Sequence, residues 1–335
     1  MTPRDRVINT IYHQVSAPIP TVLNIPQKVY QIRKEECDEL RCRFTCDLDF
    51  LDYRFSFSSS KTDSSLLQTD NWGCLWYKTP DGIFPDTDSH LLNDGNELES
   101  CLIPKPSISE SSIQEVTKFC DGNPRFIILQ SGIRPFRRLQ ALLGASQAIT
   151  MIEQRSAVLR HFLNRLHTYY LQQLHAWCAT PVDAICIGDD WTDSTGLPFS
   201  SEIWEELFLP MYSEYSKILQ ENDKFTYFST EGNIQVLLPQ LISAGVDVVR
   251  CNTTFINTER LTHHHSGKIT FHLILDPHFT SGSTLESISE KIMSIRYAAG
   301  DNGGIIGECS FLPEAPLRNI SGAMLNWRRR MPVEI

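Results

Sequence analysis

Acidic, amide, imidazole and thiol side chains follow five predicted strands of this chain, each at the point where the strand ends. They are Asp189, Asp190 and Trp191 after residues 183–188, Glu231 and Asn233 after residues 225–229, Asn252 after residues 246–251, Asp276 and His278 after residues 269–275, and Glu308 and Cys309 after residues 304–307. Carboxyl groups that share an apolar mouth raise one another's pKa and serve as general acids or bases. The pattern therefore predicts an acid–base site at one end of a sheet.

Several of these residues also have a purely structural interpretation. Asp189 is a candidate cap for the loop that follows it, and Asn233 for the helix that it begins. His278 fits a surface histidine beside a proline turn, and Cys309 fits a small buried apolar residue. The sequence leaves both interpretations open.

The other cysteines and histidines form no zinc motif of familiar spacing. The ten cysteines are spread along the chain without any C-x-x-C pair. Residues 263–265 are three successive histidines, but adjacent side chains point in different directions, and the segment leads into a strand at the opposite end of a barrel. Unpaired thiols in a chain without an export signal fit a reducing cytoplasm.

The strands that would carry the polar residues alternate with amphipathic helices. Apolar runs that predict strands lie at residues 20–26, 126–131, 183–188, 225–229, 246–251, 269–275 and 304–307, with helices between them at 111–120, 135–143, 147–176, 201–221, 233–243 and 284–299. This alternation is typical of a parallel α/β sheet, and an eighth strand is expected within residues 40–80. We therefore predict one (β/α)8 TIM-barrel domain over residues 1–335, with extra N-terminal strands and loops and with residues 40–110 as a decorating region.

Composition disfavours nucleic-acid and membrane roles. The 335 residues are 41% hydrophobic and 21% charged, which suffices for a full core. The net charge of −10 opposes binding to phosphate backbones, which requires clustered Lys and Arg. No apolar stretch approaches the ~20 residues of a membrane span, and the first residues lack an apolar export signal. We therefore expect a cytoplasmic protein that binds neither nucleic acid nor membrane.

Several segments, taken in order, resemble the uroporphyrinogen decarboxylase superfamily. They are TPRDRV at the start, residues 70–73 (DNWG), residues 188–191 (GDDW) with Pro198 and the following SSEIWEELFLPMYSEY, residues 232–249 (GNIQVLLPQLISAGVDVV), Asp276 with residues 282–283, and GGIIGECSFLPEAPLRNI near the end. Their order and spacing match over nearly the whole chain, least at residues 30–65 and 80–110. The resemblance implies a (β/α)8 barrel with a cleft at the strand C-termini, in agreement with the strand pattern.

The superfamily has two main activities, and the chain departs from the motifs of both. One branch decarboxylates the acetate side chains of uroporphyrinogen without a cofactor and carries an arginine-rich N-terminal motif, which residues 20–40 lack. The other branch passes methyl groups between a corrinoid and a thiol or another acceptor, usually with zinc held by His-x-Cys-Gly and a later cysteine. Here Ser229 and Glu231 stand in place of the His and Cys, and Cys309 matches the later cysteine.

The resemblance favours a divergent member of the methyltransferase-like branch. It implies catalytic roles for Asp189, Asp190 and Glu231, and a zinc site that includes Glu231 and Cys309. Substrate-binding roles are implied for a further set, namely Asp70, Trp72, Trp191, Asn233, Asp276 and His278.

The substrate expected from this resemblance is a small methylated compound or a methyl-corrinoid carrier protein, and a homodimer fits the superfamily. The alternatives are a cofactor-free decarboxylase of a carboxylate-rich, tetrapyrrole-type substrate and a degenerate, non-catalytic binding protein. If the first interpretation holds, Asp189→Ala is expected to abolish turnover and leave the fold intact.

Overall fold

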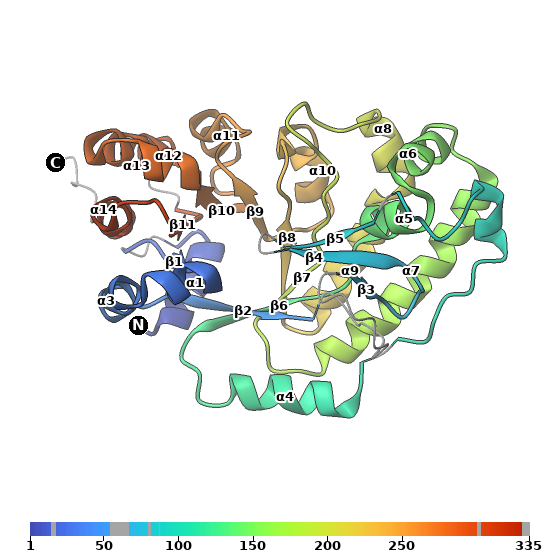
Figure 1. Cartoon of the computed structure of the whole chain (residues 1–335), viewed down its shortest axis with the longest axis horizontal. Coiled ribbons are helices and arrows are strands. Elements are labelled where there is room, and N and C mark those ends of the chain that lie inside the picture. The colour runs from blue at the N-terminus through green and yellow to red at the C-terminus, as the bar shows by residue number, and fades with distance from the viewer. Residues whose placement is uncertain are drawn as a thin grey trace.

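Eight parallel strands close almost completely into a barrel at the centre of the molecule (Figure 1). The computed structural model describes residues 1–14, 18–53, 67–79, 82–86, 88–106, 108–299 and 303–329. The strands follow the order β1-β11-β10-β9-β8-β7-β6-β2, and their bounds are β1 Thr21–Asn24, β2 Leu48–Asp52, β6 Phe126–Gln130, β7 Ala184–Cys186, β8 Phe225–Ser229, β9 Val248–Asn252, β10 Thr270–Leu275 and β11 Ile305–Ser310. At the seam between β1 and β2, Asp47 accepts the backbone N–H of Thr21 at 2.8 Å. The predicted (β/α)8 fold is confirmed.

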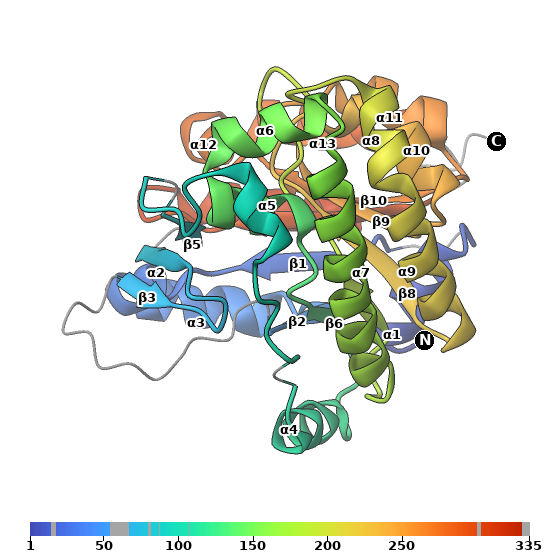
Figure 2. The same cartoon turned by 90° about the vertical axis from the view of Figure 1, so that its right-hand side faces the viewer.

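Helices surround the barrel, as Figures 1 and 2 show from two sides. Their bounds are α1 Pro3–Ile11, α2 Gln27–Ile32, α3 Lys34–Arg43, α4 Glu110–Cys120, α5 Pro135–Leu143, α6 Ala145–Glu153, α7 Ala157–Cys178, α8 Ser201–Leu207, α9 Leu209–Glu221, α10 Leu238–Ser243, α11 Thr258–His265, α12 Pro277–Gly282, α13 Leu285–Ala299 and α14 Leu317–Arg328, with short 3₁₀ helices η1 Gly95–Glu99 and η2 Ile234–Val236. Within the described residues, none of these helices is both long enough and apolar enough to span a membrane.

Helix α1 closes the N-terminal end of the barrel. Thr2 accepts the backbone N–H of Asp5, and the Asp5 carboxylate accepts the backbone N–H of Thr2, so the helix begins with a capping box. Its buried residues Val7 and Ile11 belong to the same apolar cluster as the side chains that point into the barrel. The open end of the barrel is therefore the end where the strands finish, which is where this fold places its active sites.

Several predicted elements differ from the observed ones in their extent. The helix expected at 233–243 is divided into η2 and α10. The helix expected at residues 147–176 is divided into α6 and α7, because Arg155 takes a left-handed conformation with φ of 49° between them. The helix expected at 201–221 is divided into α8 and α9 around Phe208. The strand expected at 304–307 continues as β11 to Ser310, so Glu308 and Cys309 lie inside it rather than after it.

The region expected to decorate the barrel also contains one of its strands. Residues 48–52 form β2, the expected eighth strand, which pairs in parallel with β6. A separate antiparallel sheet follows, made of β3 (Leu67–Thr69), β4 (Leu75–Thr79) and β5 (Gly82–Pro85). Strand β5 contacts α5 at the open end of the barrel, and Figure 2 shows the two side by side.

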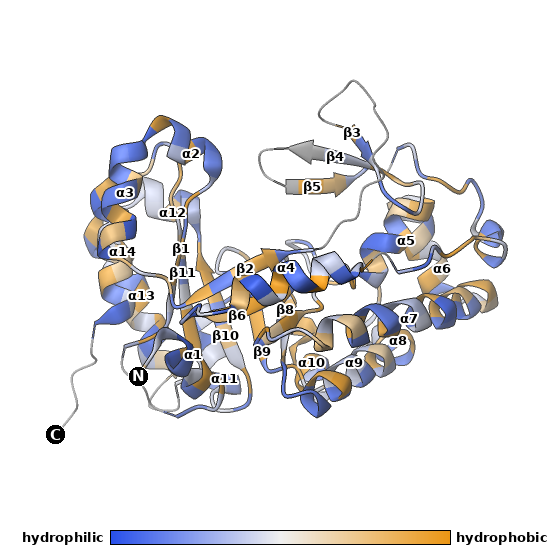
Figure 3. Cartoon of the chain, turned by 90° about the horizontal axis from the view of Figure 1, so that it is seen from below, coloured by the Kyte–Doolittle hydropathy of each residue, from blue (hydrophilic) through white to orange (hydrophobic). Residues whose placement is uncertain are grey.

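Alternation along each strand decides what lies inside the barrel. In β9, Val248 points into the barrel cluster, whereas Val249 and Cys251 belong to the apolar layer that packs against the helices. Figure 3 shows strand β6 as a mainly hydrophobic ribbon, which fits burial on both faces. A polar residue on the inward phase of such a strand is therefore exceptional.

Candidate active site

Two arginines and an aspartate meet at the mouth of the barrel. Asp190 follows β7, and its Oδ2 lies 3.1 Å from Nη1 of Arg137 and 3.6 Å from Nη1 of Arg134. Arg134 directly precedes α5, and Arg137 lies in its first turn. The three side chains are between 13% and 23% exposed, so they are reachable from solvent but mostly enclosed. Such a cluster is suited to bind and orient a charged small molecule.

The guanidinium of Arg134 has an N–H group without a hydrogen-bond partner. Its Nε is buried and has no hydrogen-bond partner, and the 3.6 Å contact with Asp190 is its one ion pair among the described residues. A buried donor without a partner costs about 1–3 kcal/mol. A carboxylate in the mouth could pair with the Nη groups of Arg134, because the side chain is 13% exposed and the planar fork of a guanidinium matches a carboxylate.

Asp189 anchors helix α5 instead of facing the mouth. Its side chain is fully buried, and its carboxylate accepts the backbone N–H groups of Phe136 at 2.6 Å and Arg137 at 3.3 Å. Burial raises the pKa of Asp189 to about 7, although the charge of Arg134 and the backbone donors act in the opposite direction. Asp189 thus positions the turn that carries Arg134 and Arg137, and its catalytic role stays a prediction.

Four charged side chains act electrostatically on Glu231 at the mouth. Glu231 is exposed, follows β8, and interacts electrostatically with Arg250 and Asp190, then with Glu308 and Arg134. Partial desolvation in the mouth raises the pKa of Glu231, and Arg250 partly offsets this effect. A carboxyl group with a raised pKa keeps its proton more readily near neutral pH and is suited to donate it.

Two glycines of the sequence motifs allow the loops of the mouth to approach closely. A Cβ atom on Gly188 would lie 2.2 Å from the backbone of Ser229, and one on Gly232 would lie 1.9 Å from the carbonyl oxygen of Thr192. Any side chain at either position would therefore push the β7 and β8 loops apart. These glycines serve packing, and through it they bring Asp190 and Glu231 together.

A chain of four polar side chains runs from the mouth into the barrel interior. Arg250 in β9 donates to Glu308 in β11 from Nε at 2.9 Å and from Nη2 at 2.8 Å. Nε2 of His272 in β10 lies 3.0 Å from Oε2 of Glu308, and its Nδ1 is bonded to the hydroxyl of Tyr227 in β8. The sequence pattern did not predict Arg250, His272 and Tyr227 as site residues. The signal was available, since a charged residue in the apolar run 246–251 is exceptional in a strand that is buried on both faces.

The protonation states within this interior chain follow from the contacts. Burial acts to raise the pKa of Glu308, but Arg250 and His272 outweigh this effect and lower it well below 4.5. Burial lowers the pKa of His272, which is therefore neutral near pH 7. Nδ1 of His272 is hydrogen-bonded to the hydroxyl of Tyr227, whereas its buried Nε2 lies 3.0 Å from Glu308 without a well-aligned hydrogen bond.

The structure corrects the predicted position of Cys309. Because β11 continues to Ser310 and side chains alternate, Glu308 points into the barrel and Cys309 points outward. Cys309 is fully buried in the apolar layer beside Trp327, and burial raises its pKa to about 12. It is thus separated from Glu231 by the wall of the barrel. Among the described residues, no group of three or more His, Cys, Asp or Glu side chains is placed to hold a metal, so the residues do not fit the expected zinc site.

Asp70 and Trp72 hold the small sheet against α5. Asp70 is 4% exposed and accepts from the indole of Trp76 at 2.8 Å and from Arg138 at 2.6 Å, as well as from two backbone N–H groups of its own turn. The guanidinium of Arg138 lies 4.6 Å from the ring centre of Trp72. These contacts attach the small sheet to α5, and the substrate-binding roles of Asp70 and Trp72 stay predictions.

We expect Asp70→Ala to loosen the attachment of this sheet. The substitution leaves Arg138 and the Trp76 indole without their acceptor, which should lower the unfolding free energy by about 1–3 kcal/mol. Urea denaturation would measure the loss, and limited proteolysis should show faster cleavage within residues 67–86. Asp88→Ala, at an exposed position of the same region, is the matched control. Equal stability of the two variants would contradict this assignment.

The other predicted substrate-binding residues are dispersed. Trp191 is fully buried, stacks on Phe136 with ring centres 4.8 Å apart and donates to Tyr212, so it belongs to the core. Asp276 accepts the backbone N–H of His278 and caps α12, while the side chain of His278 is exposed. The structure does not bring these three side chains together.

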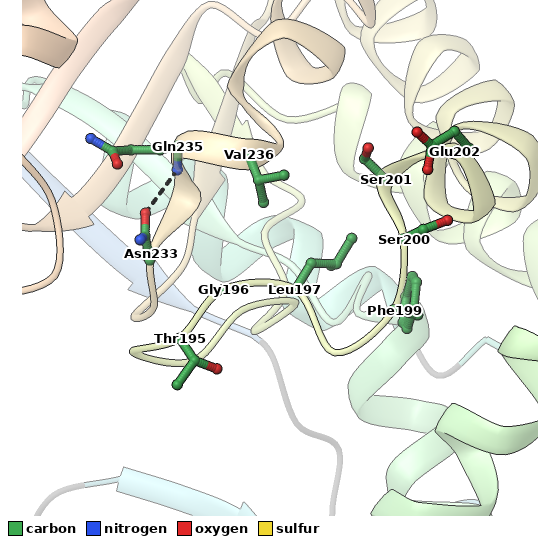
Figure 4. A pocket seen from close by; sticks show the side chains of 10 residues that line it. All are labelled: Thr195, Gly196, Leu197, Phe199, Ser200, Ser201, Glu202, Asn233, Gln235 and Val236. Atoms are coloured by element: carbon green, nitrogen blue, oxygen red, sulfur yellow. Dashed lines mark hydrogen bonds between the residues drawn. The ribbon is translucent and has the colours of Figure 1, made fainter.

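Asn233 caps η2 and borders a hollow at the outer rim of the mouth. Its side chain accepts the backbone N–H of Gln235 at 3.2 Å. The hollow measures about 640 Å³ and is lined by Thr195, Gly196, Leu197, Phe199, Ser200, Ser201, Glu202, Asn233, Gln235 and Val236. Figure 4 shows Asn233 and Gln235 on one side of it and Ser200 to Glu202 on the other. The charged groups around Asp190 do not line this hollow, so its lining offers little of the acid–base chemistry.

Comparison with known proteins supports the barrel assignment. A family model described as uroporphyrinogen decarboxylase (URO-D) matches residues 123–330. No curated protein sequence matches the chain significantly. Among solved structures, a methyltransferase from Methanosarcina mazei shares 11% identity over 98% of both chains with a TM-score of 0.71. A glycosylated endo-β-1,4-xylanase from Gloeophyllum trabeum shares 9% identity over 95% of this chain and 99% of its own, with a TM-score of 0.48. The likeness to the Methanosarcina mazei methyltransferase shows the fold of this chain.

Proposed function

The chain belongs to the uroporphyrinogen decarboxylase family, and we propose that this barrel enzyme binds a small carboxylate-bearing substrate at its mouth and acts on it by acid–base chemistry. Arg134 would hold the carboxylate, with Arg137 and Asp190 fixing its position. Glu231 would supply or accept the proton. Decarboxylation is the reaction that these groups fit best.

The single observation that carries this proposal is the incomplete hydrogen bonding of Arg134. The side chain is 13% exposed, its Nε is buried without a partner, and Asp190 lies 3.6 Å from Nη1. A guanidinium in this state retains donors for a ligand. Asp190 keeps the arginine in place without occupying it fully.

The chemistry of decarboxylation assigns a role to Glu231. Loss of CO₂ breaks a carbon–carbon bond and leaves an electron pair on the substrate carbon, which must then take a proton. Glu231 lies at the mouth, and desolvation raises its pKa, so a fraction of it retains a proton to donate. Transfer of that proton to carbon completes the reaction and leaves Glu231 ionised.

The proposed binding of a carboxylate at Arg134 is tested by titration. We expect calorimetric titration with a panel of short-chain carboxylates to give saturable binding, and Arg134→Gln to weaken it by about 10- to 100-fold, the equivalent of one charge-assisted hydrogen bond or pair. Arg318→Gln, at an exposed position on α14, is the matched control and should bind as the unmodified protein does. Equal affinity in the Arg134→Gln variant, or a panel that does not bind at all, would refute the proposal.

Methyl transfer is the second candidate, and one observation favours it. The chain matches the fold of the Methanosarcina mazei methyltransferase along 98% of its length. A corrinoid carrier as partner, a homodimer and bound zinc remain predictions from the family resemblance. Metal analysis of the purified protein together with a methyl-transfer assay would decide between the candidates. Carboxylate binding without any turnover would instead support the non-catalytic alternative.

A further inference from the structure

Arg250 is a buried cation whose orientation is fixed from below. Glu308, with a side chain 2% exposed, engages Nε and Nη2 of Arg250 in a two-point contact. His272 lies 3.0 Å from Glu308 on the side of the barrel interior, and Tyr227 is hydrogen-bonded to His272. The guanidinium therefore has little freedom to rotate, and one of its edges is committed to Glu308.

The opposite edge of this guanidinium faces the mouth. The Arg250 side chain is 18% exposed, and its Nη1 lies 3.4 Å from the hydroxyl of Ser229, at the end of β8. These contacts engage three of the five N–H groups of the arginine. Within the described part of the chain, the remaining N–H groups have no hydrogen-bond partner. They are available to a ligand that enters from the mouth.

Arg250 and Arg134 approach the same acid from different elements. Glu231 interacts electrostatically with both arginines, one carried by β9 inside the barrel and the other by the loop before α5. Both arginines are therefore near Glu231. A small molecule in the mouth beside Glu231 would be near both cations.

We propose that Arg250 is a specificity-determining residue that binds a second negative group of the substrate, so that the substrate class is a small dianion such as a dicarboxylate. This inference rests on the proposed function and deepens it. One carboxylate would meet Arg134 at the rim, and the other would meet the Nη1 edge of Arg250 at the floor. The fixed cation of Arg250 thus stands near the strand ends where the family resemblance implied a zinc ion.

A purely structural ion pair is the competing explanation, and the choice of variant separates the two. Removing Arg250 alone would leave the buried charge of Glu308 without its partner, which would destabilise the fold. The double substitution Arg250→Met/Glu308→Gln removes both charges at nearly constant volume. Circular dichroism and thermal unfolding would confirm that it folds.

The experiment compares glutarate with pentanoate, a monocarboxylate of the same chain length, and malonate to adipate with their monocarboxylate counterparts. In the unmodified protein we expect the best dicarboxylate to bind at least tenfold more tightly than its counterpart. In the double variant the ratio of the two dissociation constants should approach one, and in Arg250→Lys, which retains the charge but loses the fork, it should fall several-fold.

The outcomes distinguish this inference from the proposed function. If the unmodified protein binds no carboxylate, the proposed function fails and this inference fails with it. If it binds monocarboxylates and dicarboxylates equally, with both weakened in Arg134→Gln, only the role of Arg250 is overturned. A dicarboxylate preference that persists in the double variant overturns it as well. If the double variant does not fold, the comparison in the unmodified protein and in Arg250→Lys decides.

Discussion

Glu308→Gln is expected to lower the free energy of unfolding by about 3–5 kcal/mol, the cost typical of breaking a buried ion pair from one side. The side chain of Glu308 is 2% exposed and accepts two hydrogen bonds from Arg250. A glutamine keeps the volume but not the charge, so the Arg250 cation would remain enclosed without its counter-ion. Urea denaturation monitored by circular dichroism would measure the change.

The double variant Arg250→Met/Glu308→Gln is the control for this prediction. Replacing both members of a buried pair is often neutral, so it should recover most of the loss seen in Glu308→Gln. A double variant as unstable as the single one would mean that Glu308 stabilises the barrel through His272 or through packing. That result would contradict the assignment of the loss to an unpaired cation.

The pH dependence of stability offers an independent check on Glu308. Its pKa is lowered in the folded state, so its contribution is present above its ordinary value of 4.5 and is lost as the pH falls below it. The unmodified protein should therefore lose stability steeply on acidification below about pH 4.5, whereas Glu308→Gln should show a shallower loss. Parallel acid profiles would contradict this prediction.

Asp189→Ala is expected to lower the free energy of unfolding by at least about 3 kcal/mol, since it orphans three backbone donors at about 1–3 kcal/mol each. These donors are the N–H groups of Phe136, Arg137 and Asp190. The expectation from the sequence that this variant leaves the fold intact is revised accordingly. Because α5 carries Arg137 and follows Arg134, carboxylate binding should weaken in the same variant.

Asp189→Asn separates the hydrogen bonds from the charge. Burial raises the pKa of Asp189 from 3.8 to about 7, so the folded state holds this proton more tightly than the unfolded state. The contribution of Asp189 to the free energy of unfolding is most favourable at low pH. It falls as the pH rises between these two values, by on the order of 4 kcal/mol in total. Asparagine cannot ionise, so the Asn variant should lack this decline. A variant with the same pH profile as the unmodified protein would show that Asp189 does not titrate in this range.

The sequence by itself determined that the chain forms a barrel, and at which end of that barrel the candidate site lies. Continuous apolar runs separated by amphipathic helices leave few arrangements besides a parallel barrel. The polar residues that follow the strands belong to one rim because all strands run in the same direction. Asp190 and Glu231 were found in this way, and the structure brings both to the mouth.

Only the tertiary structure decided which polar residues face the mouth. Asp189 and Asp190 are adjacent in the sequence, yet they have different partners. Asp189 accepts hydrogen bonds from backbone N–H groups of α5, more than 50 positions earlier in the chain, whereas Asp190 pairs with arginine side chains of the same region. Glu308 and Cys309 are adjacent too, and the end of β11 at Ser310 places one inside the barrel and the other outside. Local patterns show that side chains alternate along a strand. Where the strand ends, and which of its residues point into the barrel, depend on its pairing with distant strands. The binding partner of Arg250 likewise came from a strand that the sequence places 58 residues away.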